Sequence, residues 1–144
     1  MKQIFIRLLR ERQGSAAIEF ALIGPIFITM FMGVLQIGIG MQNYNAMRGI
    51  SADVARYAVV NYQTANRLST SQLEDYTRSV AASPPYGLTR GRLTATVSTA
   101  ATQRVAGATE YSVALTYNVP SVLGIMGMQD IPLNYTRPIF VISE

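Results

Sequence analysis

A long run without charge constrains this chain more than any other feature. No charged residue occurs from Phe20 to Met47, and between Phe20 and Met41 the only clearly hydrophilic residues are Thr29 and Gln36. The last 22 residues of the apolar block 15–41 alone, as a helix rising about 1.5 Å per residue, reach the roughly 30 Å of a bilayer core. The block therefore predicts a transmembrane helix over residues 15–41.

The helix is predicted to continue beyond the membrane. In NAMRGISADVARYAVV the apolar residues recur at helical spacing, while Arg48, Asp53 and Arg56 occupy other directions. We expect one helix that is apolar all round in its first half and amphipathic in its second half, ending at about residue 62. The stripe that needs a packing partner consists of Met47, Ile50, Val54, Tyr57 and Ala58.

The remaining residues, 63–144, predict a small domain outside the membrane. Ser71 and Glu74 have the spacing of a capping box and indicate a helix over residues 72–82, which ASPPYG then ends. Apolar and polar residues alternate in three later segments, which predicts strands. These segments are RLTATVST, EYSVALTYNVP and IPLNYTRPIFVIS, and Pro138 in the third suits an edge or a bulge.

The expected fold class is α+β, with a long N-terminal helix packed on a small antiparallel sheet of about three strands. A few strands alone bury too little apolar surface to be stable, so the sheet needs a cover. The amphipathic stripe of the long helix is the natural cover.

Composition excludes several kinds of chemistry. The chain has no Cys and no His, which removes thiol nucleophiles, disulfides, the usual zinc sites and imidazole catalysis. Its acids form no pair suited to general acid–base work apart from the adjacent Glu74 and Asp75, which point about 100° apart on a helix and are interpreted as a solvated face. No phosphate loop or G-x-S-x-G motif occurs. We therefore predict no enzyme, no cofactor and no metal.

The basic residues are concentrated at the N-terminus. Four of them precede Gly14 against the single acid Glu11, which gives +3 of the formal net charge of +4. Because this cluster is short and followed at once by the apolar block, we interpret it as a topology signal and not as a nucleic-acid-binding surface. It indicates a cytoplasmic N-terminus and an extracytoplasmic C-terminal domain. The four residues are Lys2, Arg7, Arg10 and Arg12.

A motif joins the basic leader, residues 1–14, to the apolar block. The leader ends at Gly14, Glu19 follows five residues later, and the aromatic Phe20 comes directly after the glutamate. This pattern resembles the cleavage and assembly signal of type IV prepilins and pseudopilins. Within that superfamily, GSAAIEFALIGPIF is similar to the TadE-like branch, the minor pilins or pseudopilins of tight-adherence (Flp-type) pilus systems. The major Flp pilins are much shorter than this chain.

The resemblance implies a type IV pilin-like fold and a processing step. A prepilin peptidase would cut after Gly14 at the cytoplasmic face and leave Ser15 with a new α-amine. The implied partners are that peptidase, other pilins or pseudopilins of the tight-adherence system, the inner-membrane assembly platform and the lipid bilayer. The implied location is the bacterial inner membrane, as a single-pass protein, or the pilus itself; the resemblance does not distinguish filament, tip and assembly machine.

Glu19 is then interpreted as a register device, together with Phe20. A charge in hydrocarbon costs about 2.5–3.5 kcal/mol on insertion scales, so the carboxylate needs a partner. One helical turn from a new N-terminus, it can approach its own α-amine or that of a neighbouring subunit. Wrong axial registers would leave the charge alone.

The segment PSVLGIMGMQD, residues 120–130, is unusually apolar for a loop. We expect it to pack on the domain's own sheet or on a partner pilin, through Leu123, Ile125 and Met126. Two other interpretations of the whole chain stay open. One is a secreted binding domain whose signal peptide is cut near Gly40, and the other is a plain signal-anchored envelope protein; the N-terminus of the mature protein separates all three.

Overall fold

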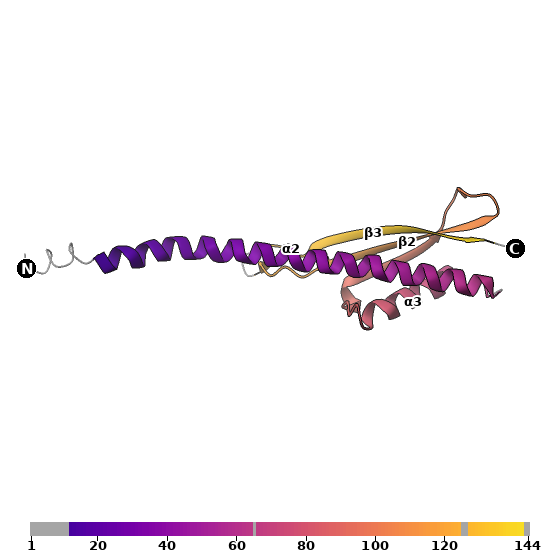
Figure 1. Cartoon of the computed structure of the whole chain (residues 1–144), viewed down its shortest axis with the longest axis horizontal. Coiled ribbons are helices and arrows are strands. Elements are labelled where there is room, and N and C mark those ends of the chain that lie inside the picture. Colours follow the sequence, from indigo (N-terminus) through magenta and orange to yellow (C-terminus); the bar gives the residue numbers. More distant parts are fainter. Residues whose placement is uncertain (1–11, 65, 125–126, 143–144) are drawn as a thin grey trace, which may run out of the picture.

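The computed structural model describes residues 12–64, 66–124 and 127–142, with side chains of the long helix from Ala16 onward. It shows a long N-terminal helix packed on a three-stranded antiparallel sheet, the α+β arrangement expected (Figure 1). The elements are α2 (Arg12–Gln63), α3 (Thr70–Ala82), the short 3-10 helix η1 (Arg90–Arg92), β1 (Leu93–Thr99), β2 (Ala108–Val119) and β3 (Ile131–Ile142).

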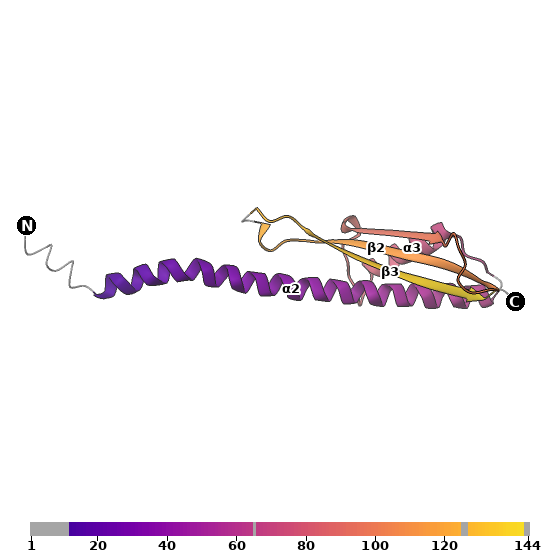
Figure 2. The same ribbon diagram turned by 90° about the horizontal axis from the view of Figure 1, so that it is seen from above.

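Helix α2 runs without a break through both halves predicted from the sequence. It begins at Arg12, so the helix already includes Gly14 and Ser15, and it ends at Gln63. Pro25 lies inside it and cannot donate a backbone hydrogen bond. The Thr29 hydroxyl donates to the Pro25 carbonyl over 2.8 Å. The N-terminal half of α2 extends well beyond the rest of the molecule, while the sheet and α3 lie along its C-terminal half (Figures 1 and 2).

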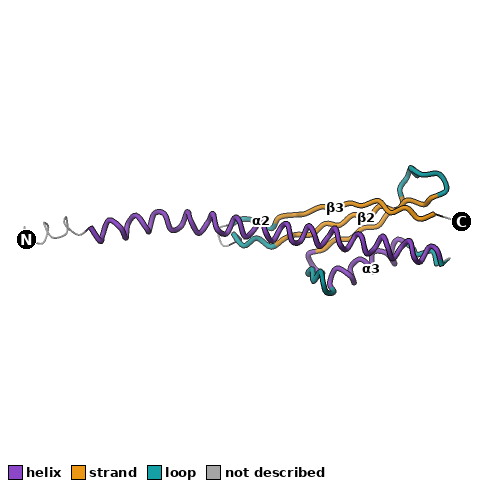
Figure 3. The backbone as a smooth tube through the Cα atoms, viewed as in Figure 1, coloured by secondary structure: helices purple, strands orange, loops and turns teal. Residues whose placement is uncertain are grey.

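The sheet has the strand order β1-β2-β3, with both neighbouring pairs antiparallel. Val97 lies opposite Val113 on the first pair, and Leu115 lies opposite Tyr135 on the second. The three predicted strands are confirmed and are drawn in orange in Figure 3. Pro138 lies on β3, an edge strand, where a residue without an N–H costs no ladder bond if it faces outward.

The core forms where α2 and α3 cover one face of the sheet. Four members of the predicted stripe are at most 4% exposed, namely Met47, Ile50, Val54 and Ala58. The fifth, Tyr57, stacks on Tyr76 of α3 with ring centroids 3.7 Å apart. The amphipathic half of α2 is therefore the cover that the sheet requires.

The start of α3 differs from the sequence prediction. The helix begins at Thr70, and the capping box is formed by Ser69 and Gln72, not by Ser71 and Glu74. The Gln72 backbone N–H donates to the Ser69 hydroxyl over 3.2 Å, and the Gln72 side-chain oxygen accepts from the Ser69 N–H over 2.8 Å. Both pairs have the same spacing, and the pair two residues earlier makes the reciprocal bonds.

Glu74 was also predicted to lie on a solvated face, and this is wrong because it reaches β1. Its carboxylate accepts from the Val97 N–H over 2.8 Å, and Arg78 donates to the Ala95 carbonyl over 3.2 Å. The two side chains thus occupy polar groups on the free edge of β1, which would otherwise be open to strand pairing. Asp75, whose side chain is 80% exposed, does lie on the solvated face.

The turn after α3 is held against α2 by Tyr86. Its hydroxyl donates to the Asp53 carboxylate over 2.8 Å, and its ring lies so close to Gly49 that a Cβ there would come within 2.6 Å of it. Burial raises the pKa of the Tyr86 phenol, and the hydrogen bond to Asp53 raises it further. This contact needs a residue without a side chain on α2.

The connection between β1 and β2 is attached to the far end of the sheet by Glu110, which is 5% exposed. Arg104 Nε donates to the Glu110 carboxylate over 2.9 Å, and the guanidinium lies over the ring of Phe140. The hydrogen bond from Arg104 lowers the pKa of the Glu110 carboxyl. This loop lies at the end of the sheet that is farther from the N-terminal half of α2 (Figure 1).

Candidate assembly interface

The first half of α2 exposes apolar side chains on all sides. Apart from the half-buried Met32, its large hydrophobic residues from Ile18 to Ile37 are at least 43% exposed. The helix is long and apolar enough to cross a membrane, and none of the residues in its most apolar window is buried. Because no part of the described domain covers this surface, it requires lipid or other helices around it.

Glu19 and Phe20 lie at the start of this surface. Both are exposed on α2, and the Phe20 side chain is 78% exposed. Ser15 and Glu19 both belong to α2 and are one helical turn apart, so they share a side of the helix. The side chains of Gly14 and Ser15 lie outside the described ones.

A hollow of about 420 Å³ on α2 lies beside Phe20. Gly24 and Pro25 are among the residues that line it, and every lining residue is apolar. It can receive a hydrocarbon chain or an apolar side chain of another helix, but it offers no side-chain donor or acceptor. The lining residues are Phe20, Ala21, Ile23, Gly24, Pro25, Phe27 and Ile28.

Gln36, near the end of the apolar block, connects the exposed apolar half of α2 to the domain. Its side chain is 6% exposed and makes two hydrogen bonds to the loop after β2. The amide Nε2 donates to the Pro120 carbonyl over 3.3 Å, and the Val122 N–H donates to Oε1 over 2.7 Å. Sequence reasoning noted Gln36 only as a hydrophilic member of the block. A single amide in an apolar helix was the signal that could have pointed to such a contact.

The apolar loop 120–130, expected to pack on the domain's own sheet or on a partner pilin, has residues of both buried and exposed kinds. Leu123 is 8% exposed and therefore turned inward, whereas Met128 is 53% exposed. Ile125 and Met126 lie outside the described residues. In both views the connection between β2 and β3 extends beyond the rest of the sheet, toward the membrane half of α2 (Figures 1 and 2).

An apolar groove of about 390 Å³ opens where α2 passes the start of β3. Ile37 and Met41 contribute from the helix, and Ile131 and Leu133 contribute from the strand. Tyr44, which also lines the groove, meets Tyr135 of β3 edge to face with ring centroids 5.7 Å apart. The groove thus continues the uncovered apolar surface of α2 up to the sheet.

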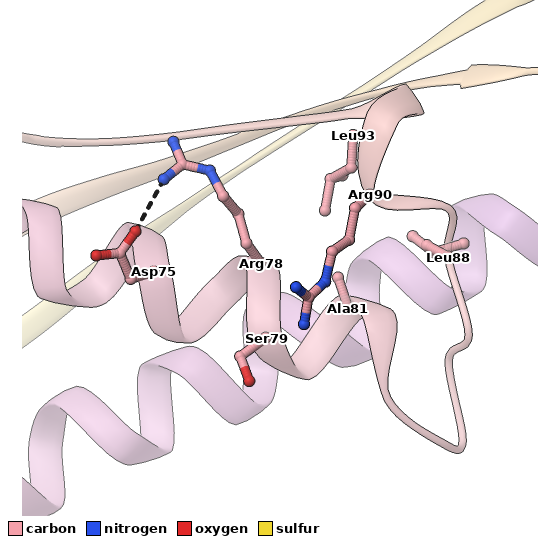
Figure 4. Close-up of a pocket in the computed structure, with 7 residues that line it drawn as sticks. All are labelled: Asp75, Arg78, Ser79, Ala81, Leu88, Arg90 and Leu93. Carbon is pink, nitrogen blue, oxygen red and sulfur yellow. Dashed lines mark hydrogen bonds and ion pairs between the residues drawn. The ribbon is translucent and has the colours of Figure 1, made fainter.

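A third hollow, of about 280 Å³, lies between α3 and η1 (Figure 4). Asp75 is paired there with Arg78, and Ser79 and Arg90 also line the hollow. The arrangement brings no base to the Ser79 hydroxyl, so it lacks the pairing that activates a nucleophile. Among the described residues, no three acidic side chains gather into a group that could hold a metal ion.

Taken together, these features define a class of protein: a small α+β domain on a long helix whose uncovered apolar half fits a single-pass membrane anchor. The model of the TadE-like protein family matches residues 14–56, from Gly14 to Arg56 in the amphipathic half of α2. Over this segment the chain is similar to TadE-like proteins, which is consistent with a pilin of the tight-adherence system. No curated protein and no solved structure matches the chain.

Proposed function

We propose that the protein is a minor pilin or pseudopilin that takes part in assembling a tight-adherence (Flp) type IV pilus. One observation carries the proposal: the TadE-like match begins at Gly14 and covers the exposed apolar half of α2, which has Glu19 at its start. A surface of this kind is suited to packing against other apolar helices in lipid or in a filament. The family is structural, and the α3–η1 hollow offers no catalytic constellation.

In this proposal a prepilin peptidase cleaves the chain after Gly14. Glycine suits a cut where the backbone must enter a narrow site, because it has no side chain. Cleavage removes the +3 leader that keeps the N-terminus cytoplasmic and leaves an α-amine on Ser15. The C-terminal domain, from residue 63 onward, is extracytoplasmic.

The new amine and Glu19 are one turn apart, and this supports the register role. A carboxylate at the membrane border costs about 2.5–3.5 kcal/mol if it is buried in lipid without a partner. The ammonium of Ser15, in the same subunit or a neighbour, offsets that cost by a charge-assisted hydrogen bond. Phe20 lies beside it on the wall of the hollow at Gly24 and Pro25, so an adjacent helix that fits the hollow is also set in register.

The mass of the mature chain tests the proposal. We expect the membrane fraction of cells with a complete pilus system to contain a chain that begins at Ser15. Gly14→Leu should leave the full-length chain in the membrane. Gly33→Leu, the same change at a glycine of α2 with open space around it, should be processed normally.

Two other masses contradict the proposal. A mature chain that begins near Met41 indicates signal-peptidase cleavage, and a wild-type chain that keeps residues 1–14 indicates a plain anchor. A cut near Gly40 would also remove Gln36, which the loop after β2 uses as its contact on α2. This contact supports an uncut helix beyond Ser15.

A further inference from the structure

The tip of the β2–β3 connection, defined here by the described residues Ser121–Gly124 and Gly127–Gln129, lies alongside the apolar block of α2 and not above it. Gln36 fixes this position, because it bonds Pro120 and Val122 and is itself within the charge-free run. Leu123 is turned inward, while Met128 of the tip and Ile131 beside it are 53% and 40% exposed.

Most backbone N–H groups of the described tip residues are paired, which lowers the cost of a position near hydrocarbon. The Val122 N–H uses Gln36, and the Ser121 N–H donates to Asp130 over 3.1 Å. Within the tip, the N–H groups of Gly124 and Gly127 donate to the carbonyls of Ser121 and Gly124 over 3.2 and 3.0 Å. Gly127 has φ +83°, which a side chain would strain, so the turn depends on glycine.

The positions of the charged residues near the tip also fit a membrane interface. The tip itself contains no charged residue, and the first charge after it, Asp130, is paired with Arg92 of η1. The hydrogen bond from Arg92 lowers the pKa of the Asp130 carboxyl, so the pair stays ionised. An apolar tip followed at once by an ion pair matches the change from acyl chains to water across a membrane interface.

We propose that the tip of the β2–β3 connection is a second membrane contact, resting in the interfacial layer of the bilayer that α2 crosses. Met128 and Ile131 contact acyl chains there, and the groove between Met41 and Leu133 is filled by lipid. Lipid is favoured over a protein partner because the tip and groove continue the lipid-accessible surface of α2 and present no free charged group for recognition.

This position of the tip changes where along α2 the outer border of the membrane is expected. The transmembrane block was predicted to end at residue 41, whereas the proposal places the outer border near Gln36. The α2 segment from Ala16 to Gln36 is about 30 Å long at 1.5 Å per residue, which equals the thickness of a bilayer core. The proposal depends on α2 crossing the bilayer, but not on cleavage at Gly14 or on pilus assembly.

Tryptophan fluorescence tests the proposal, because the chain contains no Trp. Single-Trp variants of the full chain would be reconstituted into phosphatidylcholine–phosphatidylglycerol vesicles, with or without lipids brominated near the headgroup or deep in the acyl chain. Met128→Trp reports the tip. Val105→Trp, at a residue 49% exposed on the opposite loop, is the matched control, and Val34→Trp reports the membrane half of α2.

We expect Met128→Trp to be quenched several-fold more than Val105→Trp, and more by shallow than by deep bromine. Val34→Trp should be quenched by deeper bromine. Equal, weak quenching of Met128→Trp and Val105→Trp with Val34→Trp quenched would overturn the tip contact and leave the anchor intact. An unquenched Val34→Trp would overturn both. If Met128→Trp is unquenched and its emission shifts to the blue only when other pilins are added, the occupant is protein and the lipid proposal is wrong.

Discussion

The two halves of α2 belong to one continuous helix but differ in how their apolar residues are covered. Before Gln36 the apolar residues surround the helix and stay exposed, whereas from Met47 onward they form one stripe that the sheet and α3 bury. The difference teaches that the angular spread of apolar residues predicts what covers a helix. An all-round pattern needs lipid or other subunits, and a stripe needs the chain's own domain.

The two halves also differ in what a substitution should disturb. A change in the exposed half acts on insertion and assembly, because its contacts are outside the chain. A change in the buried half acts on the stability of the domain. Matched substitutions in the two halves test this comparison. It fails if a change in the exposed half lowers domain stability, or if a change in the buried half acts only on insertion and assembly.

The largest expected effect is the loss of assembly in Glu19→Gln. The amide forms a weaker, uncharged hydrogen bond to the proposed Ser15 ammonium, so the register of neighbouring subunits is no longer fixed. Membrane insertion and cleavage should persist, since the apolar block and Gly14 are unchanged. Membrane fraction, mature mass and recovery with sheared pili or partner pseudopilins would be measured in one strain.

Asp75→Asn is the control for Glu19→Gln, because it removes the same charge from an exposed site of the C-terminal domain. Its ion pair with Arg78 is exposed and contributes little stability, so assembly should be normal. Wild-type recovery of a correctly processed Glu19→Gln chain would show that Glu19 is only a charge at the membrane border.

The parts of the fold that the sequence predicted are those with a clear period. Met47, Ile50 and Val54 repeat at helical spacing over a long segment, and the strands alternate, so neither depends on knowing what lies opposite. The capping box was misplaced because Ser69–Gln72 and Ser71–Glu74 both fit the same pattern two residues apart. Local spacing cannot choose between them, and Glu74 is instead used by the edge of β1.

The contact of Gln36 could not be predicted for a different reason. Its partners are backbone groups 84 and 86 residues further along the chain, and backbone groups leave no mark in a sequence. The apolar loop 120–130 was expected to be covered, but composition does not tell which of its residues turn inward. Only the fold distinguishes Leu123, which is buried, from Met128, which is exposed.

A smaller effect is expected from shortening one isoleucine in each half. Ile50→Ala should lower the free energy of unfolding of the domain by about 2–5 kcal/mol, because it leaves a cavity in a fully buried site. Ile26→Ala, at a side chain 65% exposed, should leave it unchanged. Urea midpoints in a mild detergent, followed by circular dichroism, measure both. Equal midpoints for the two variants would mean that the stripe is not the core of the domain.

The smallest expected effect on the free energy of unfolding comes from substitutions at two glycines. Gly33→Ala adds a methyl group to open space in the exposed half, so it should not lower stability. Gly49→Ala places a Cβ 2.6 Å from the Tyr86 ring, which must move away from Asp53. The crowding costs about 1–3 kcal/mol, and the better helix propensity of Ala offsets about 1 kcal/mol of it. The net loss is therefore expected to be at most about 2 kcal/mol in the same urea experiment.

A second background separates crowding from any other effect of the Gly49 methyl group. In a Tyr86→Ala chain the ring is gone, so Gly49→Ala should no longer be unfavourable and should stabilise the domain by up to about 1 kcal/mol. The change of sign between the two backgrounds is the expected result, and Gly33→Ala should behave alike in both. If Gly49→Ala costs the same with and without Tyr86, the close approach of α2 to the turn after α3 is not what requires a glycine, and the buried half of the helix is held to the domain by its apolar stripe alone.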